Sequence, residues 1–326
     1  MSSLPLFNSK HLNLIKTSVP SLSDGLQEII AEYMPAFGEL YDNFDLEKDD
    51  FFCRSYSIGP DGLCYSIYGN HHKVLCHDRK GNIIKSFECA PYNGEETEFA
   101  TSIHCGPLIN DRGIFYIYFY NFEMSELRIY TSNERLFKVI NNIGQFRVHS
   151  LAGIGLYGNL CFLANPIDGF VILNPEGEFL FDFSIKDKLN EKGFPANDII
   201  TVNKNKLYTP LSIFYENSYR DLIYVLDQKY NVITKYINIG PYKYDVDYWY
   251  GPVFYNGRAY LSNSQTQKII MFTDDFETVV DEFTIDSTDN KTPTQKYENN
   301  IIFNISQDGF IYILSSDTKK MMVFYA

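Results

Sequence analysis

The sequence predicts an all-β protein, a six-bladed β-propeller of four-stranded antiparallel blades, from a repeat that runs through the whole chain. A tight turn leading into an alternating strand occurs six times, and an aromatic residue marks each copy three positions after a Gly or Asn. These markers recur every 46 to 52 residues: Tyr65, Tyr116, Phe162, Tyr208, Tyr260 and Tyr312. The 26 Phe and 26 Tyr residues also favour strands, where flat side chains pack on pleated faces.

Each copy contains the same elements in the same order. A first β-run, such as residues 51–57, precedes the turn and the marker strand, as in DGLCYSI from Asp61. A third run follows, such as KIIMFTD from Lys268, and five copies continue into a fourth, such as EFLFDFS from Glu178. We therefore expect a single propeller domain, residues 1–326, with blades near 51–89, 100–141, 147–185, 197–239, 250–285 and 300–326.

The last copy ends after its third strand, at Ala326. An unpaired edge would be prone to aggregation, so another segment is expected to cover it. The alternating stretch SKHLNLIKTS, residues 9–18, is rich in β-formers, so residues 1–20 are predicted to supply the strand that closes the ring. Residues 21–50 would lead into blade one and include one short helix near residues 21–34.

Charge and hydropathy exclude several classes of partner. With a net charge of -13 and a pI near 4.9, the chain is not expected to bind nucleic acid, and no stretch approaches the roughly 18 apolar residues of a transmembrane span. The first twenty residues lack the apolar core of a secretory signal. The compartment is therefore cytoplasmic if this is the native start, and periplasmic or exported if a signal was removed.

Common catalytic motifs are missing from the sequence. It contains no G-x-S-x-G nucleophile elbow, no H-E-x-x-H and no P-loop, so enzymatic activity is the less favoured hypothesis and no cofactor is identified. The six cysteines form no C-x-x-C pair, and Cys64 and Cys161 occupy a repeat position that is hydrophobic in the other copies. We expect both to be buried. His71, His72 and His77 are expected to be solvent-exposed.

The lengths of the connecting segments distinguish two faces of the disc. The turns between first and second strands and between third and fourth strands are short and rich in Gly, Asn and Asp, which tolerate positive φ. The segments between blades, and SIFYENSYRD within blade four, are longer. Because long loops on a rigid scaffold usually carry function, we expect the site on this long-loop face, around the central channel.

The innermost strands should begin at that face, so their first residues are candidates for the channel mouth. Counting back from the marker aromatics and adding the linker into blade five predicts the ligand-binding residues Arg54, His104, His149, Asn197, Asp245, Asp247, Tyr248 and Trp249. Aromatic faces beside carboxylates suit sugars, whereas the alternative is that the tyrosines of this linker pack together to order it. His104 and His149 begin neighbouring blades and could together hold a metal or a general base.

The repeat resembles the six-bladed propellers of NHL and TolB-like type, which include many uncharacterised bacterial proteins. The resemblance rests on GLCYSIYGNHHKVLCHDRKGNIIKSF from Gly62 to Phe87, and GFVILNPEGEFLFDF from Gly169 repeats it. PAFGELYDNFDL, before blade one, is similar to the Gly-Pro-Glu-Tyr-type loop of the bacterial group. Enzymes with the NHL-like fold, such as amidating lyases and metal lactonases, hold a metal through His or acidic residues in the channel. Only His104 and His149 could correspond, so that activity is not carried over.

Two hypotheses of function follow. The first is a non-enzymatic binding propeller that recognises a glycan, a peptide or a protein partner on its long-loop face. The alternative is a hydrolase or lyase with a metal or His-based site at the mouth of the central channel, using His104, His149 and Arg54.

Overall fold

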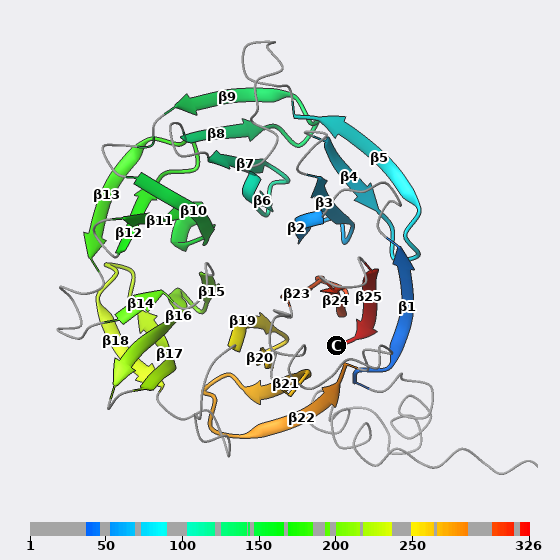
Figure 1. Ribbon diagram of the computed structural model, residues 1–326, viewed down its shortest axis with the longest axis vertical. Coiled ribbons are helices and arrows are strands. Elements are labelled where there is room, and N and C mark those ends of the chain that lie inside the picture. The colour runs from blue at the N-terminus through cyan, green and yellow to red at the C-terminus, as the bar shows by residue number, and fades with distance from the viewer. Residues whose placement is uncertain are drawn as a thin grey trace, which may run out of the picture.

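Six antiparallel sheets stand around a central axis like the blades of a propeller (Figure 1), which confirms the predicted fold class. The structure is a computed structural model, and it describes residues 37–45, 53–68, 73–89, 103–120, 125–141, 143, 147–165, 169–184, 193–195, 200–215, 218–236, 249–263, 266–285, 302–315 and 320–326. Within these residues, no helix is long and apolar enough to cross a membrane.

The first three blades each contain four strands, ordered from the channel to the rim as they occur in the chain. Blade one consists of β2 (Cys53–Ile58), β3 (Cys64–Tyr68), β4 (Lys73–His77) and β5 (Ile83–Glu88). Blade two consists of β6 (Ile103–Ile109), β7 (Phe115–Tyr120), β8 (Ser125–Tyr130) and β9 (Leu136–Asn141). Blade three consists of β10 (Arg147–Ile154), β11 (Leu160–Asn165), β12 (Gly169–Leu173) and β13 (Phe179–Ser184).

The other three blades follow the same order, with differences in blades four and six. Blade four consists of β14 (Gly193–Pro195), β15 (Thr201–Asn203), β16 (Lys206–Tyr215), β17 (Ser218–Leu226) and β18 (Val232–Tyr236). Blade five consists of β19 (Trp249–Tyr255), β20 (Arg258–Asn263), β21 (Lys268–Thr273) and β22 (Val279–Thr284). Blade six consists of β23 (Ile302–Ile305), β24 (Phe310–Ser315), β25 (Lys320–Tyr325) and β1 (Leu40–Asp45).

The ring closes through β1, which pairs with β25 so that Phe44 lies opposite Met321. An N-terminal strand therefore closes the ring, as predicted, but the assignment of this strand to residues 9–18 is wrong. Both edges of β25 are occupied, one by β1 and the other by β24. Phe44 holds residues 40–45 in place, because its side chain is buried in the junction between blades six and one. The predicted helix near residues 21–34 lies outside the described residues.

Blade four corrects a second expectation. The segment SIFYENSYRD was predicted to be a long loop, but β16 extends to Tyr215 and β17 begins at Ser218, with Phe214 opposite Tyr219 and Tyr215 opposite Ser218. Its Ile213, Phe214, Tyr215 and Tyr219 are residue types that favour strands. The innermost strand of this blade is divided, because β14 and β15 pair with different parts of β16.

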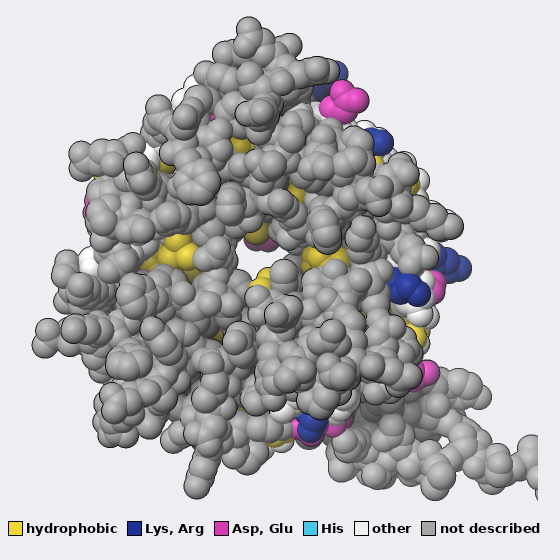
Figure 2. Space-filling model, in the orientation of Figure 1, with side chains coloured by type: hydrophobic (Ala, Val, Ile, Leu, Met, Phe, Trp, Pro, Cys, Tyr) yellow, Lys and Arg dark blue, Asp and Glu magenta, His cyan; other side chains and the backbone are white. Residues whose placement is uncertain are grey.

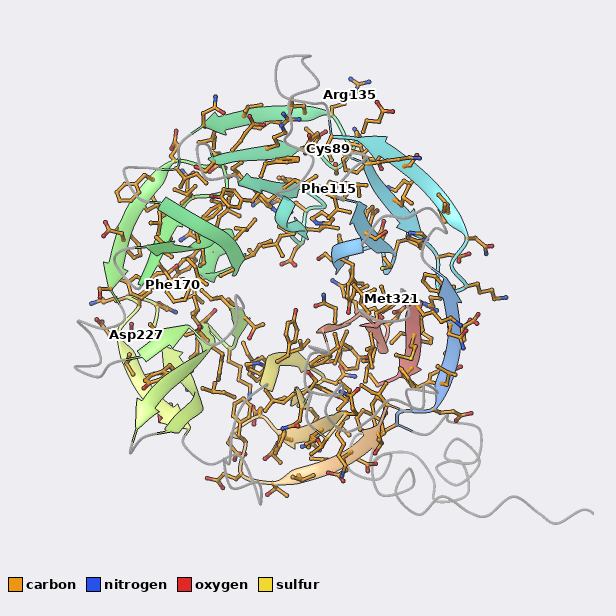
Figure 3. The ribbon with its side chains drawn as sticks, in the orientation of Figure 1. Cys89, Phe115, Arg135, Phe170, Asp227 and Met321 are labelled. Atoms are coloured by element: carbon orange, nitrogen blue, oxygen red, sulfur yellow. The ribbon has the colours of Figure 1, made fainter. Side chains whose placement is uncertain are left out.

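The hydrophobic core is divided into six slabs, one at each junction between neighbouring blades. Each slab combines side chains from two blades, for example Tyr116 and Phe162 between blades two and three. Figure 3 shows these side chains filling the spaces between sheets, with Phe115 and Cys89 at the junction of blades one and two. Because both faces of the second strand are covered, β7 carries large apolar side chains at successive positions.

The predicted tight turns are confirmed, and several of them begin at a polar side chain that accepts backbone hydrogen bonds. Asp78 Oδ1 accepts from the N–H groups of Lys80 and Asn82 in the third-to-fourth turn of blade one. Asn110 Oδ1 accepts from those of Arg112 and Ile114 in the first-to-second turn of blade two. These bonds fix the turns and so define a compact turn face, opposite the long-loop face.

Two predictions about buried side chains have opposite outcomes. Cys64 and Cys161 are fully buried, as expected for small hydrophobic residues. His77, however, is not exposed: it lies on β4, where its Nε2 is 3.0 Å from Ser66 Oγ and Phe44 stacks on its ring. The prediction failed because β4 is the third strand of its blade, and β1 of blade six covers it.

Candidate functional site

Three of the predicted site residues occupy equivalent places in three consecutive blades. The innermost strands β2, β6 and β10 lie beside the central channel (Figure 1). Near the start of each strand, the pairing with the second strand of the blade shifts by one residue, which is the signature of a β-bulge. The residue skipped by the pairing is Arg54 in β2, His104 in β6 and His149 in β10.

A bulge takes one residue out of the ladder and bends the strand, and bulges are over-represented beside active sites. Since β6 contacts both β2 and β10, the fold brings the three bulges to one side of the channel. They lie near the strand ends opposite the tight turns, which is the long-loop end. The residue types are those that interact with anions, hydroxyl groups and metals: one guanidinium and two imidazoles.

The other predicted residues are only partly described. Trp249 is the first residue of β19, in blade five, and blades five and two face each other across the ring (Figure 1). Asn197, Asp245, Asp247 and Tyr248 lie outside the described residues, as do the side chains of Arg54, His104, His149 and Trp249. That the eight residues act together therefore stays a prediction. Among the side chains that are described, no three His, Cys, Asp or Glu residues are grouped as a metal ion requires.

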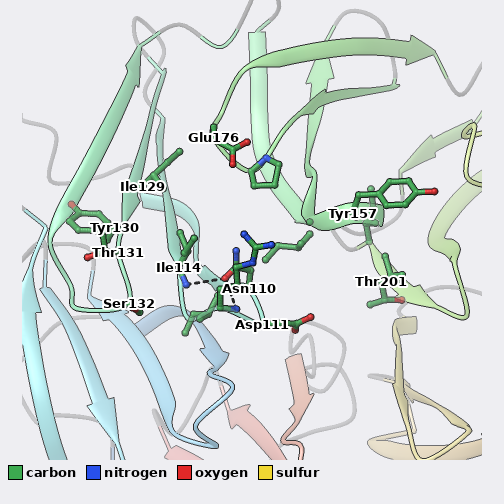
Figure 4. Close-up of a pocket in the computed structure, with 18 of the residues that line it drawn as sticks. Asn110, Asp111, Ile114, Ile129, Tyr130, Thr131, Ser132, Tyr157, Glu176 and Thr201 are labelled. Carbon is green, nitrogen blue, oxygen red and sulfur yellow. Dashed lines mark hydrogen bonds between the residues drawn. The ribbon is translucent and has the colours of Figure 1, made fainter.

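A hollow of about 1190 Å³, the turn-face groove, opens on the opposite face of the disc. It is lined mainly by the turns of blades two and three and reaches residues of blades four and five beside the channel. Figure 4 labels Asn110, Asp111 and Thr131 of blade two, Tyr157 of blade three and Thr201 of blade four among the residues that line the groove. Among the described side chains, the space-filling view has hydrophobic groups around the central opening (Figure 2).

The wall of the groove contains a short hydrogen-bonded chain. Asn110 Nδ2 donates to the hydroxyl of Tyr116 over 3.2 Å, and that hydroxyl donates to the carbonyl of Pro175 in blade three over 3.3 Å. Burial raises the pKa of Tyr116 to about 12, although the neighbouring Asn110 acts in the opposite direction. The phenol therefore remains protonated near neutral pH and connects the two walls of the groove.

The groove contains the run GIGLYG, residues 153–158, which has the glycine spacing of a dinucleotide-binding turn. Here it connects two antiparallel strands, β10 and β11, through the 3₁₀ turn Leu156–Gly158. No α-helix follows, so the helix N-terminus that binds a pyrophosphate in such motifs is missing from this segment. The match in spacing therefore has no structural basis as a nucleotide site.

The turn-face groove was not expected from the sequence. Long loops were expected to carry the function, whereas this groove is built mainly from tight turns of two blades, which are brought together only by the ring. The available signal was Tyr157, a large aromatic in a tight turn of the kind that favours Gly, Asn and Asp.

Comparisons with known proteins agree with the fold. No protein-family model matches the chain, and no curated protein sequence matches it. Among solved structures, Kuenenia stuttgartiensis hydrazine synthase has 10% identity, covering 83% of each chain, with a TM-score of 0.53. The WD40 repeats of RRP9 have 7% identity over 89% of this chain and 99% of that one, with a TM-score of 0.51.

A streptogramin B lyase structure is similar as well, with 12% identity over 87% of this chain and 97% of the lyase, and a TM-score of 0.50. At such low identities these likenesses concern the fold alone. The strand topology and the structural neighbours together define the class: this chain is a six-bladed β-propeller protein.

Proposed function

We propose that this protein is a non-enzymatic binding propeller that recognises a glycan, a peptide or a protein partner at the long-loop end of its central channel. The observation that carries the proposal is the set of three bulges at Arg54, His104 and His149, at nearly the same strand position in consecutive blades. Bulges are over-represented next to active sites, so their position at one end of the channel supports a role in binding.

The residue types narrow the ligand chemistry. An arginine presents five N–H donors in a fixed plane, and a histidine can donate or accept a hydrogen bond. Such groups bind hydroxyl and carboxylate oxygens, which sugars and peptides both offer. Trp249, at the start of β19 across the ring, would add an aromatic face, and Asp245, Asp247, Tyr248 and Asn197 would complete the surface from the adjoining segments.

Glycan and peptide arrays probed with the full chain test this proposal. The affinity of the best ligand is then measured by calorimetry for Arg54→Ala, Tyr248→Ala and Trp249→Ala. We expect at least a tenfold loss in each variant, since a lost charge-assisted hydrogen bond or aromatic contact removes about 1.5 kcal/mol or more. Arg135→Ala, which changes an exposed arginine on the turn face (Figure 3), should bind normally. Unchanged affinity in all three variants would dismiss the long-loop face.

A second candidate function is a hydrolase or lyase at the same channel mouth. The observation that favours it is that two of the bulged residues on neighbouring strands, His104 and His149, are potential metal ligands or general bases. Metal analysis of protein purified without a histidine tag separates the two functions. A stoichiometric ion that is lost in His104→Ala and His149→Ala would favour the enzyme, and metal-free protein that binds its ligand fully would favour the binding protein.

A further inference from the structure

Tyr157, at the turn-face groove, has an unusual combination of backbone and side-chain environment. Its φ is 60° and its ψ 18°, the left-handed conformation, which costs a residue with a side chain free energy relative to glycine. Its side chain is nevertheless 72% exposed. The turn itself is closed by backbone hydrogen bonds, from Asn159 N–H to the Leu156 carbonyl and from Gly155 N–H to the Asn159 carbonyl. The tyrosine side chain is not needed to form it.

Two other left-handed aromatic residues provide a comparison. Tyr230 and Phe276 have φ values of 59° and 61°, but they are only 3% and 1% exposed. Tyr230 packs edge-on against Phe181 at a centroid distance of 5.0 Å, and Phe276 packs near Tyr208 at 6.2 Å. Burial of these rings offsets the cost of their backbone conformation. At Tyr157 no comparable burial offsets the cost, and uncompensated strain of this kind is characteristic of functional positions.

The surroundings of Tyr157 resemble the centre of a protein-binding surface. The groove has a floor of aliphatic side chains, including Ile114, Ile154 and Val253, which are only partly buried. At its edge stand Phe137, which is 64% exposed, and the exposed Arg112. Exposed aromatic and arginine residues beside an apolar floor are the composition that marks protein-interaction hot spots.

The charges around the groove are balanced. Asp111 and Glu176 lie on its edge with Arg112, and Lys138 Nζ donates to the Glu176 carbonyl over 2.8 Å. Two acidic and two basic groups therefore stand together in a chain whose net charge is -13. An environment of this kind complements an uncharged ligand rather than a strongly basic or acidic one. The volume also exceeds the 300–1,000 Å³ or so of typical small-molecule pockets, which favours an extended occupant.

We propose that the turn-face groove binds an extended, uncharged peptide segment of a partner protein, with an apolar side chain of that segment packed against Tyr157 and the aliphatic floor. This site is separate from the long-loop face, and it uses residues that the proposed function does not involve. Tyr157 is then retained for binding, although glycine would suit its backbone conformation better.

Substitution by glycine separates binding from folding at this position. The probe is a peptide chosen on the full chain from a displayed library of random 12-residue sequences, then synthesised and labelled for fluorescence anisotropy. For Tyr157→Gly we expect at least a tenfold loss of affinity for this peptide, together with a thermal unfolding midpoint that is unchanged or higher. Phe137→Ala should also weaken binding, whereas Phe179→Ala, an aromatic 51% exposed on β13 outside the groove, should not.

Each of the other outcomes overturns the proposal. A library that yields no binder, or a peptide that binds Tyr157→Gly and Phe137→Ala as tightly as the unchanged protein, would show that the groove is not a peptide site. A lower unfolding midpoint in Tyr157→Gly would assign the tyrosine a structural role. Neutral oligosaccharides that bind the unchanged chain but not Tyr157→Gly, in the absence of peptide binding, would assign the groove to glycans instead. None of these results bears on the Arg54, His104 and His149 variants.

Discussion

At one position of the third-to-fourth turn, the space against the core is filled by different side chains in different blades. The residue at this position has a positive φ in each of blades one to five: Gly81, Glu134, Gly177, Tyr230 and Phe276. Where it is glycine, a side chain of the preceding blade occupies the space: a Cβ added to Gly177 would lie 2.0 Å from Ile140 Cδ1. Where it is aromatic, its own ring enters the core.

The contact with Ile140 predicts that Gly177→Ala is destabilising. The added methyl group meets Ile140, at a cost of about 1–3 kcal/mol for overpacking, on top of about 1 kcal/mol for the left-handed backbone at φ +78°. Urea unfolding measures the loss. Gly257→Ala is the matched control, because its φ of +69° imposes similar backbone strain but nothing lies within 4 Å of its Cβ. Equal losses in both variants would contradict the packing explanation.

The turn after β21 predicts a small effect of pH on stability. The Thr273 hydroxyl and the Glu277 N–H donate to the Asp275 carboxylate, and they hold its pKa below the ordinary value. A carboxyl whose pKa is lowered in the folded state contributes stability that is fully present above its unfolded pKa, about 3.9, and is lost as the pH falls through the folded pKa. Asp275→Asn should therefore lower the unfolding midpoint slightly at pH 7 and leave it unchanged near pH 2. A midpoint lowered equally at both pH values would contradict this origin.

At the scale of elements, β8 contains a buried ion pair between blades one and two. Glu126 and Arg128 are 3% and 5% exposed, and the Arg128 Nε donates to Glu126 Oε1. The guanidinium carbon also lies 5.0 Å from the centre of the Phe119 ring. A buried pair of this kind gains Coulomb energy, but it loses the hydration of both charges.

Breaking this pair should cost much more than replacing it. Glu126→Gln leaves the Arg128 charge buried without its counter-ion, so we expect a loss of about 3–5 kcal/mol in the free energy of unfolding. The double variant Glu126→Leu with Arg128→Met removes both charges and should lose far less. Denaturant unfolding of both proteins makes the comparison. A double variant at least as unstable as Glu126→Gln would show that the pair itself stabilises the junction.

The repeat made the inner elements predictable, because the second and third strands of each blade are covered on both faces and are mostly apolar. The outermost strands lack this signal, since one face is exposed: Ile83 and Phe179 are about half exposed on β5 and β13. The closing strand β1 is one of these outermost strands, and its sequence is not typical of a strand. Residues 40–45, LYDNFD, contain three turn-forming polar residues, and burial of Phe44 favours them over residues 9–18.

The candidate site, like the fold, was predictable only in part. Counting back from the marker aromatics located Arg54, His104 and His149 near the starts of their strands. The bulges that set these residues apart could not be foreseen, because a register shift depends on the partner strand. The turn-face groove was missed for a related reason: its walls belong to turns about 45 residues apart, such as those holding Asn110 and Tyr157, which meet only when neighbouring blades pack together.

At the scale of the whole molecule, closure of the ring brings together the residues of both proposed binding surfaces. Six blades and six junction slabs form a closed circle, in which no blade has a free face. The junction of blades six and one depends on β1, which covers the outer edge of β25 and places Phe44 in the core. Without β1, that edge would be open and blade six would lose its outermost strand.

Two truncated chains, one that starts at Phe37 and one that starts at Leu46, test this closure directly when their thermal unfolding is compared with that of the full chain. Because it keeps β1, the chain that starts at Phe37 should unfold in a single cooperative transition near the midpoint of the full chain. The second should unfold at a clearly lower temperature, or aggregate, because it lacks β1. A chain starting at Leu46 as stable as the full protein, or one starting at Phe37 as unstable as the shorter chain, would contradict this role of β1.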